Sequence, residues 1–302
     1  MIGRITRWLS VAWLLALVAV ALGADCMASD RPLAYSRRGE TTFLPSSGPR
    51  GDDLRATLGP DDWAIWPPIA ASPTDVRTAG QLLPLSPPSA AHRLGTDDRG
   101  RDVAARLVHG ARTSLTAAAI AASLATALAL LLALLAVRAG GAIESATLAL
   151  CDVLAAAPAL LGAIAIGGLT GARGVTALAL LVAIPRAADT ARLVAASLTS
   201  TLAEPFVTAA RAAGASPSRV LLRHALPHAI STITAAAAIT AATTILAEAA
   251  LSFLGLGAPP PTPSWGELLQ QASQNDLRWW LGLPAGVVTT LTAAAFLRIY
   301  RR

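Results

Sequence analysis

The sequence contains no lysine, and this absence excludes a major class of function. All 24 basic residues are arginines, whereas a P-loop uses a lysine to hold the phosphates of a nucleotide. The chain is therefore not expected to hydrolyse ATP itself. Cysteine is nearly absent as well. Cys26 and Cys151 lie far apart in the sequence and give no metal-ligand spacing, so neither a disulfide nor a cysteine metal site is expected.

Charged and aromatic residues are also scarce. They make up 14% and 4% of the chain, whereas 54% of the residues are hydrophobic and the mean hydropathy is +0.56. This composition excludes an ordinary water-soluble domain. Although the pI is near 10.8, no basic cluster is interleaved with aromatic residues, so nucleic acid is not expected as a partner. The arginines stand instead at the ends of long apolar segments, which indicates a lipid bilayer as the environment.

Six segments are apolar enough to cross a bilayer, which takes about 20 residues of helix. They cover about residues 8–23, 113–137, 146–169, 174–195, 228–252 and 281–299. The first could instead be a cleaved signal peptide, because Arg4 and Arg7 precede its apolar run. An uncleaved helix is preferred, since Asp25 directly before Cys26 makes a poor lipoprotein site. The fold class that follows is an all-α membrane protein with six transmembrane helices.

The predicted organisation has three parts. Residues 1–23 form a cytoplasmic N-terminus and the first transmembrane helix, residues 24–112 a loop outside the cytoplasm, and residues 113–302 a core of five further helices. The distribution of arginines gives this orientation, with both termini cytoplasmic. Only Glu144 and Glu204 oppose the arginines that it places inside: Arg4, Arg7, Arg138, Arg211, Arg219, Arg223, Arg298, Arg301 and Arg302.

Within the outer loop, residues 32–45 alternate apolar and polar side chains around Arg38-Gly39. This pattern predicts a short β-hairpin. The proline-rich stretches that follow favour extended chain over helix. We therefore expect a small extracytoplasmic insertion after the first transmembrane helix.

A polar segment, residues 196–227, lies between the fourth and fifth apolar segments. Glu204-Pro205 predicts a helix start, and Phe206 begins a small apolar patch. Gly214 predicts a turn, and Ser216-Pro217 a second helix that ends at Leu226-Pro227. These residues alone leave two interpretations open. The segment is either an ordinary cytoplasmic loop or a stiff pair of helices suited to a cleft in another protein.

A few ionisable residues lie in or beside the apolar segments. Asp189 and Arg192, spaced by three, predict an ion pair on one helix face or, alternatively, a contact to a charged substrate. Glu248 is a candidate for the substrate path, because a carboxylate at that depth must face the bundle or water. His224 and His228 have the i, i+4 spacing of two metal ligands. Pro227 intervenes and no third ligand is evident, so no metal site is predicted.

Two further motifs flank the second and fifth apolar segments on the outer side. Thr96-Asp97-Asp98 contains helix-capping residues, and residues 100–112 predict an amphipathic helix at the membrane surface, where Arg99, Arg101 and Asp102 could pair with one another or with headgroups. Pro259-Pro260-Pro261 predicts a rigid bend. The candidate residues here are structural caps and anchors or, alternatively, contacts to a substrate-binding protein or a gate: Asp97, Asp98, Arg101, Asp102, Pro260 and Trp265.

The 196–227 segment resembles the EAA loop of the permeases of binding-protein-dependent ABC importers. That motif reads Glu-Ala-Ala, three residues, glycine, nine residues, an apolar position and Leu-Pro, and Thr208-Ala209-Ala210, Gly214 and Leu226-Pro227 match its spacing. Thr208 replaces the glutamate and His224 the apolar residue, so coupling strength or partner choice is expected to differ. The resemblance implies an ATPase-coupling role for Glu204, Phe206, Thr208, Ala209, Ala210, Arg211, Gly214, His224, Leu226 and Pro227.

Residues 94–115 and 247–269 resemble the C-type permease of the dipeptide, oligopeptide and nickel importer family, and the resemblance covers roughly residues 90–302. The outer loop is similar to that of the long-loop permease for microcin C and peptides. The resemblance implies a non-enzymatic subunit of the bacterial inner membrane without a cofactor of its own. Its expected partners are a homologous B-type permease, two ABC ATPases that hold ATP and Mg, and a periplasmic binding protein that delivers a peptide. A nickel permease of the same family and an unrelated secondary transporter are the alternatives.

Overall fold

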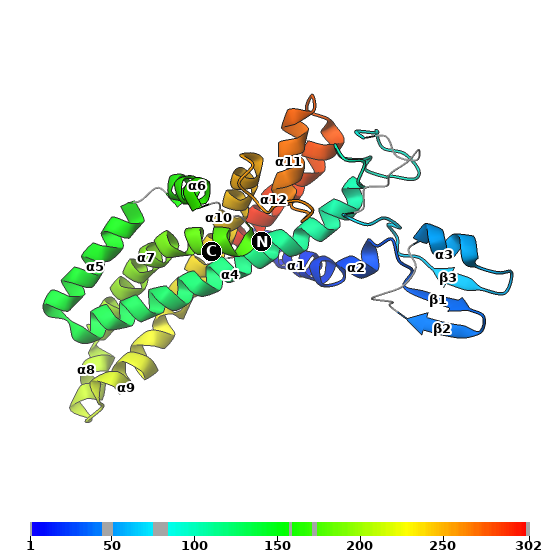
Figure 1. The fold of residues 1–302 in the computed structure, drawn as a ribbon. Coiled ribbons are helices and arrows are strands. Elements are labelled where there is room, and N and C mark those ends of the chain that lie inside the picture. Colours follow the sequence, from blue (N-terminus) through cyan, green and yellow to red (C-terminus); the bar gives the residue numbers. More distant parts are fainter. Residues whose placement is uncertain (1, 44–50, 75–83, 157–158, 171–173, 300–302) are drawn as a thin grey trace. The chain divides into compact units, whose positions relative to one another are not determined.

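The computed structural model describes residues 2–43, 51–74, 84–156, 159–170 and 174–299 (Figure 1). Within these residues the chain is mainly helical. The long helices are α1 (Ile2–Leu22), α4 (Val103–Ala139), α5 (Gly141–Ala156), α6 (Ala159–Thr170), α7 (Val175–Leu202), α10 (Leu226–Phe253) and α12 (Trp279–Arg298). The shorter elements are α2 (Ala24–Met27), α3 (Gly51–Thr57), α8 (Pro205–Ala212), α9 (Pro217–Arg219), the π-helix η1 (Val220–Ala225), α11 (Trp265–Gln274), and the strands β1 (Ala34–Arg37), β2 (Glu40–Phe43) and β3 (Trp63–Ile65).

The chain divides into two compact units. The first unit comprises Met1–Ser10, Ala117–Ala247 and Ala293–Arg302, and the second unit comprises Val11–Thr116 and Glu248–Thr292. Helices α1, α4, α10 and α12 each contribute residues to both units. The predicted division at residues 23 and 112 follows membrane topology, which is a different property, and it stays a prediction.

Four helices of the described chain are long and apolar enough to cross a membrane: Ile5–Leu22, Val103–Ala139, Pro217–Phe253 and Trp279–Arg298. They coincide with the predicted first, second, fifth and sixth spans. Helices α5 and α6 cover the predicted third span, 146–169, apart from residues 157 and 158, which lie outside the described residues. Helix α7 covers the fourth, but it carries Arg186, Asp189 and Arg192. A mainly helical membrane protein is confirmed, and the count of six spans stays a prediction.

The second span differs from its prediction at its N-terminal end. We expected an amphipathic helix over 100–112 and a separate span over 113–137, whereas α4 runs without interruption from Val103 to Ala139. No proline lies between these residues, and a single glycine, Gly110, is not sufficient to end a helix. The change from polar to apolar side chains therefore marks a change of environment along one helix.

The predicted hairpin is confirmed within the described part of residues 32–45. Strands β1 and β2 pair antiparallel, with Ala34 opposite Phe43 and Arg37 opposite Glu40. The two residues between them, Arg38 and Gly39, have φ angles of 53° and 84°. Positive φ at both central residues is the geometry of the tight turn that matches the twist of a hairpin. Strand β3 pairs with the other edge of β1, which gives the sheet order β2-β1-β3, with α3 beside the sheet in Figure 1.

Alanine is the commonest buried residue in three clusters that join helices of the first unit. Along α4 and α7, a buried cluster consists of Ala121, Ala125, Ala179, Ala183 and Ala187. A second cluster brings in α5 through Cys151, together with Ala129, Ala188 and Ala191. Such small side chains let helix backbones approach closely, and van der Waals packing then holds the helices together in a membrane. The many alanines of the sequence therefore allow the helices of this unit to pack closely.

Candidate functional site

The 196–227 segment begins as the sequence predicts. Its first residues continue α7 to Leu202, and α8 then starts at Pro205 with Glu204 in extended conformation at the N-cap position. Proline suits the first position because its missing N–H would have no helical partner there. Within α8 only Val207 is buried. Phe206, Thr208, Ala209 and Arg211 are exposed, and Ala210 is half-buried.

Gly214 forms the predicted turn between the two helices. Its φ is +86°, a left-handed conformation that residues with a side chain adopt only at a cost, although a Cβ at this position would meet no atom within 4 Å. The next helix begins as predicted at Pro217, with Ser216 at the N-cap. The N–H of Arg219 donates to the hydroxyl of Ser216 at 3.4 Å.

The predicted end of this second helix at Leu226-Pro227 is wrong. The chain passes from α9 through the π-helix η1 directly into α10. In a regular α-helix the ring of Pro227 would clash with the carbonyl of the residue four positions earlier, Arg223. A π-helical turn widens the backbone just before the proline, and the N–H of Leu226 donates to the carbonyl of Leu221, five residues back. The segment is thus built into the start of a long apolar helix.

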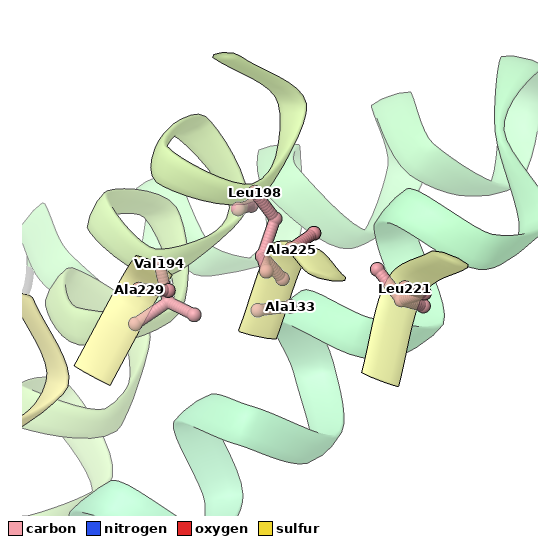
Figure 2. Packing of buried hydrophobic residues seen from close by; sticks show 7 residues of the cluster. Ala133, Val194, Leu198, Leu221, Ala225 and Ala229 are labelled. Atoms are coloured by element: carbon pink, nitrogen blue, oxygen red, sulfur yellow. The ribbon is translucent and has the colours of Figure 1, made fainter. Parts of the chain in front are cut away.

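The buried side of η1 ties the segment to three long helices. Leu221 and Ala225 pack with Ala133 of α4 and with Val194 and Leu198 of α7, as Figure 2 shows. The same cluster includes Ala229 in the first turn of α10. The ring of Phe206 in α8 lies 5.5 Å from that of His228 in α10. His224 and Leu226 are half-buried, whereas Pro227 is exposed.

The charged residues of α7 do not form the predicted pair. Asp189 lies 3.4 Å from Arg186 on its own helix, and Arg192 lies 2.9 Å from Asp152 of α5. The prediction considered one helix only, whereas α5 packs beside α7 and supplies a second acid. All four side chains remain partly exposed.

In the second unit, four of the residues predicted for docking are buried: Asp97, Arg101, Asp102 and Trp265. A cluster of acidic and basic side chains, called here the buried ion cluster, consists of Asp97, Arg101, Arg106 and Glu267. Arg101 donates from Nε to Asp97 at 2.7 Å and from Nη2 to Glu267 at 3.2 Å. Arg106 donates to the other oxygen of Glu267 and, at 2.7 Å, to the carbonyl of Pro73. The expected pairing of Arg101 with Asp102 is therefore wrong, because Asp97 and Glu267 occupy the guanidinium.

Asp102 caps a helix and contacts a histidine instead of pairing with Arg101. Its Oδ1 accepts the N–H of Ala105 at 2.8 Å, which caps the first turn of α4. Its Oδ2 lies 2.7 Å from Nδ1 of His92. The cap of this helix is thus Asp102 rather than a residue of 96–98. Asp97 instead accepts the backbone N–H groups of Arg99 and Arg101.

Trp265 and Pro260 lie in contrasting environments. The indole of Trp265 is fully buried and donates to the carbonyl of Leu107 at 2.9 Å. A Cβ on Gly110 of α4 would come within 2.8 Å of this indole, so the close approach requires glycine. Pro260 is exposed. Of the six residues predicted for docking or gating, Pro260 and the partly exposed Asp98 are the two that present surface, and the role stays a prediction.

Glu248, the predicted substrate-path residue, is 2% exposed. Its carboxylate accepts hydrogen bonds from Ser114 of α4 at 3.0 Å and from Ser252 at 2.8 Å. These bonds satisfy a carboxylate that would otherwise be costly at such a depth, and they join α4 to the end of α10. A contribution to the substrate path stays a prediction.

The residues predicted from the sequence for this region do not include Arg106 or Glu267. A local signal for Glu267 was present, because Ser264 precedes it by three residues in the pattern of a capping box. In the structure the N–H of Glu267 donates to the hydroxyl of Ser264 at 3.1 Å. The partnership with Arg106, 161 residues away, has no local signal.

Asp98 gives a pH-dependent prediction. Desolvation is the main cause that raises the pKa of Asp98 above 3.8. The neighbouring carboxylate of Asp97 adds to this rise, while Arg101 opposes it. As the pH falls, the folded protein therefore takes up a proton on Asp98 before the unfolded protein does. The stability of the fold increases as the pH falls through the folded pKa of Asp98 toward its unfolded pKa. We expect Asp98→Asn to raise the free energy of unfolding at neutral pH by less than about 1 kcal/mol, because a third of the side chain reaches solvent. Thermal unfolding in mild detergent at decreasing pH would contradict this if both proteins had the same pH dependence.

Comparison with known proteins places the chain in a family. Residues 125–302 match the binding-protein-dependent transport system inner membrane components. The glutathione transport system permease protein GsiD of Shigella flexneri is 40% identical over 185 residues, which cover 61% of this chain and 61% of GsiD. The dipeptide transport system permease protein DppC of Alkalihalophilus pseudofirmus is 37% identical over 211 residues, 70% of this chain and 69% of DppC.

The four apolar helices of the described residues, together with the family match over residues 125–302, define a mainly helical membrane permease. The chain belongs to the family of binding-protein-dependent transport system inner membrane components. The predicted membership among ABC importer permeases is thereby confirmed. The likeness of its outer loop to the microcin C form stays a prediction.

Proposed function

We propose that this chain is the C-type permease subunit of an ABC importer for peptides. It has no catalytic site of its own. It pairs with a homologous B-type permease, and two ABC ATPases with bound ATP and Mg dock from the cytoplasm. A periplasmic binding protein delivers the peptide. Family membership and the printed functions of GsiD and DppC support this assignment.

In this proposal the protein crosses the bacterial inner membrane six times, with both termini in the cytoplasm. Helices α5 and α6 together provide the third span and α7 the fourth. The 196–227 segment then lies in the cytoplasm, and residues 24–112 form the extracytoplasmic insertion. The four apolar helices support a multi-pass protein, and the arginine distribution supports the orientation.

The observation that carries the proposal is the contrast between the two sides of the 196–227 segment. Helix α8 and the Gly214 turn present exposed side chains, which a partner protein can contact. Leu221 and Ala225, on the other side, are locked among α4, α7 and α10. A displacement of the exposed side must therefore move the parts of α4, α7 and α10 that pack against Leu221 and Ala225, because packed interiors transmit strain.

Alternating access follows from this connection. When ATP closes the ATPase pair, the segments of the two permeases approach each other and the cavity opens outward. Hydrolysis separates them, and the cavity opens inward. The ATPases can shift this equilibrium only through contacts that differ between the two states, and in this proposal those contacts run through α8 and the Gly214 turn.

Purification from native membranes in mild detergent tests the proposal. We expect an ABC ATPase and a second permease to copurify with the chain. Ala209→Arg, which places a bulky charge on the exposed face of α8, should release the ATPase and retain the second permease. Ala139→Arg, an equal change at an exposed position outside the segment, should retain both. A lone homodimer that still concentrates solute would instead favour a secondary transporter.

A further inference from the structure

The first unit contains a pocket of about 900 Å³ between α5, α7 and α10. This volume lies within the range of about 300–1,000 Å³ that is typical of small-molecule sites. Much of the wall is apolar, formed by Leu148, Leu193 and Ile239, but hydroxyl and charged groups interrupt it. The charged groups of the wall are Glu144, Arg186, Asp189 and Arg192.

Charges of both signs in this wall are unusual for their position. Arg186 and Asp189 follow the apolar start of α7, residues 175–184. Charged side chains within apolar helices usually face the bundle interior or water, and they mark substrate or ion pathways. Their ion pair is loose: the two side chains lie 3.4 Å apart and are 33% and 45% exposed. A pair so exposed contributes little to stability, so the structure alone gives no reason for its presence.

We propose that this pocket holds the transported molecule by two opposite charges, with a carboxylate of the ligand on Arg186 and an ammonium group on Asp189. Glu144 and Arg192 lie in the same wall and supply a second charge of each sign. The ligand class is a zwitterion whose two charges lie at its ends, which is the form of a short peptide with free termini. This inference rests on the proposed function and adds the site and the groups that it recognises.

The energetics favour such a ligand over a simple ion. An anion alone would have to compete with Asp189 for the guanidinium, and a cation alone with Arg186 for the carboxylate. A zwitterion can replace both partners at once, so that each side chain exchanges one charged contact for another. Charge-assisted hydrogen bonds are roughly twice as strong as neutral ones, and they become stronger still where the bound ligand displaces water from the pocket. Thr190, Thr199 and Thr240 in the wall can bond the peptide group between the termini.

Three probes separate the two contacts. Alanyl-alanine carries both charges, its N-acetyl form lacks the ammonium group, and its amide lacks the carboxylate. Binding of each is measured by calorimetry on the full-length chain with its copurifying subunits, without a binding protein. We expect alanyl-alanine to bind at least about tenfold more tightly than either blocked form, the discrimination that one charge-assisted bond supplies.

The variants should change discrimination rather than affinity in general. Asp189→Asn should bind alanyl-alanine and its N-acetyl form alike, while it still rejects the amide. Arg186→Gln should do the converse. Arg138→Gln removes an exposed arginine of the same unit outside the pocket and should behave as wild type. The proposal is overturned if wild type binds none of the probes at millimolar concentration, if it binds all three alike, or if each variant weakens all three equally.

Uptake of alanyl-alanine by cells separates this inference from the proposed function. Normal uptake together with binding that ignores charge overturns the pocket assignment alone. If the chain binds the probes charge-selectively but cells that lack it take up alanyl-alanine equally well, the proposed function as a peptide importer is overturned and the pocket assignment stands.

Discussion

Gly214→Val is expected to abolish peptide uptake while the protein still inserts and assembles. The φ of +86° at this position is strained for any side chain and most strained for a β-branched one. Keeping the turn would cost about 1–2 kcal/mol, and this cost favours a rearranged turn in which α8 shifts relative to α9. Because a Cβ here meets no atom within 4 Å, the effect comes from backbone conformation rather than from a clash. We expect uptake to fall more than about tenfold, since the coupling geometry is lost.

Gly214→Asn is the matched control. Asparagine adopts the left-handed conformation more readily than other non-glycine residues, and the open space accommodates its side chain. Uptake by this variant should stay close to wild type. The measurements are uptake of a labelled dipeptide and, in parallel, the amount of ATPase that copurifies. Normal uptake by the valine variant would argue against a coupling role for this turn.

The helix starts and turns of the 196–227 segment could be predicted because their signals are local. Pro205 and Ser216-Pro217 favour helix starts within one or two residues, and Gly214 permits the left-handed turn between them. The structure follows all of these signals. The rule that failed was equally local. Proline at 227 predicted a helix end, but the π-helix before it removes the clash on which the rule depends.

The contacts of the charged residues could not be predicted in the same way. Arg192 pairs with Asp152 of another helix, and Arg106 with a residue 161 positions away. Spacing along one helix suggests which residues share a face, but it does not say which helix packs there. For the same reason, Asp97 and Arg101 were assigned to a surface, although the fold buries them.

Glu267→Gln is expected to destabilise the second unit by about 3–5 kcal/mol, the usual cost of removing one partner from a buried ion pair. Glu267 contacts both Arg101 and Arg106, which are 1% and 0% exposed. Without this carboxylate, two buried guanidinium groups share the single charge of Asp97, which lies 2.7 Å from Arg101 and 3.4 Å from Arg106. Thermal unfolding in mild detergent and protease sensitivity of residues 248–292 measure the effect. Glu40→Gln, an exposed acid of the same unit, should change neither.

A second variant separates loss of charge balance from loss of packing. In Glu267→Gln combined with Arg106→Met, one buried positive charge disappears together with the negative one. Replacing a buried ion pair by apolar groups is often close to neutral, whereas breaking it is not. The double variant should therefore recover much of the stability that Glu267→Gln loses. If the two substitutions instead reduce stability additively, the buried ion cluster does not act as a charge-balanced unit. Glu267 and Arg106 would then contribute to stability independently of each other.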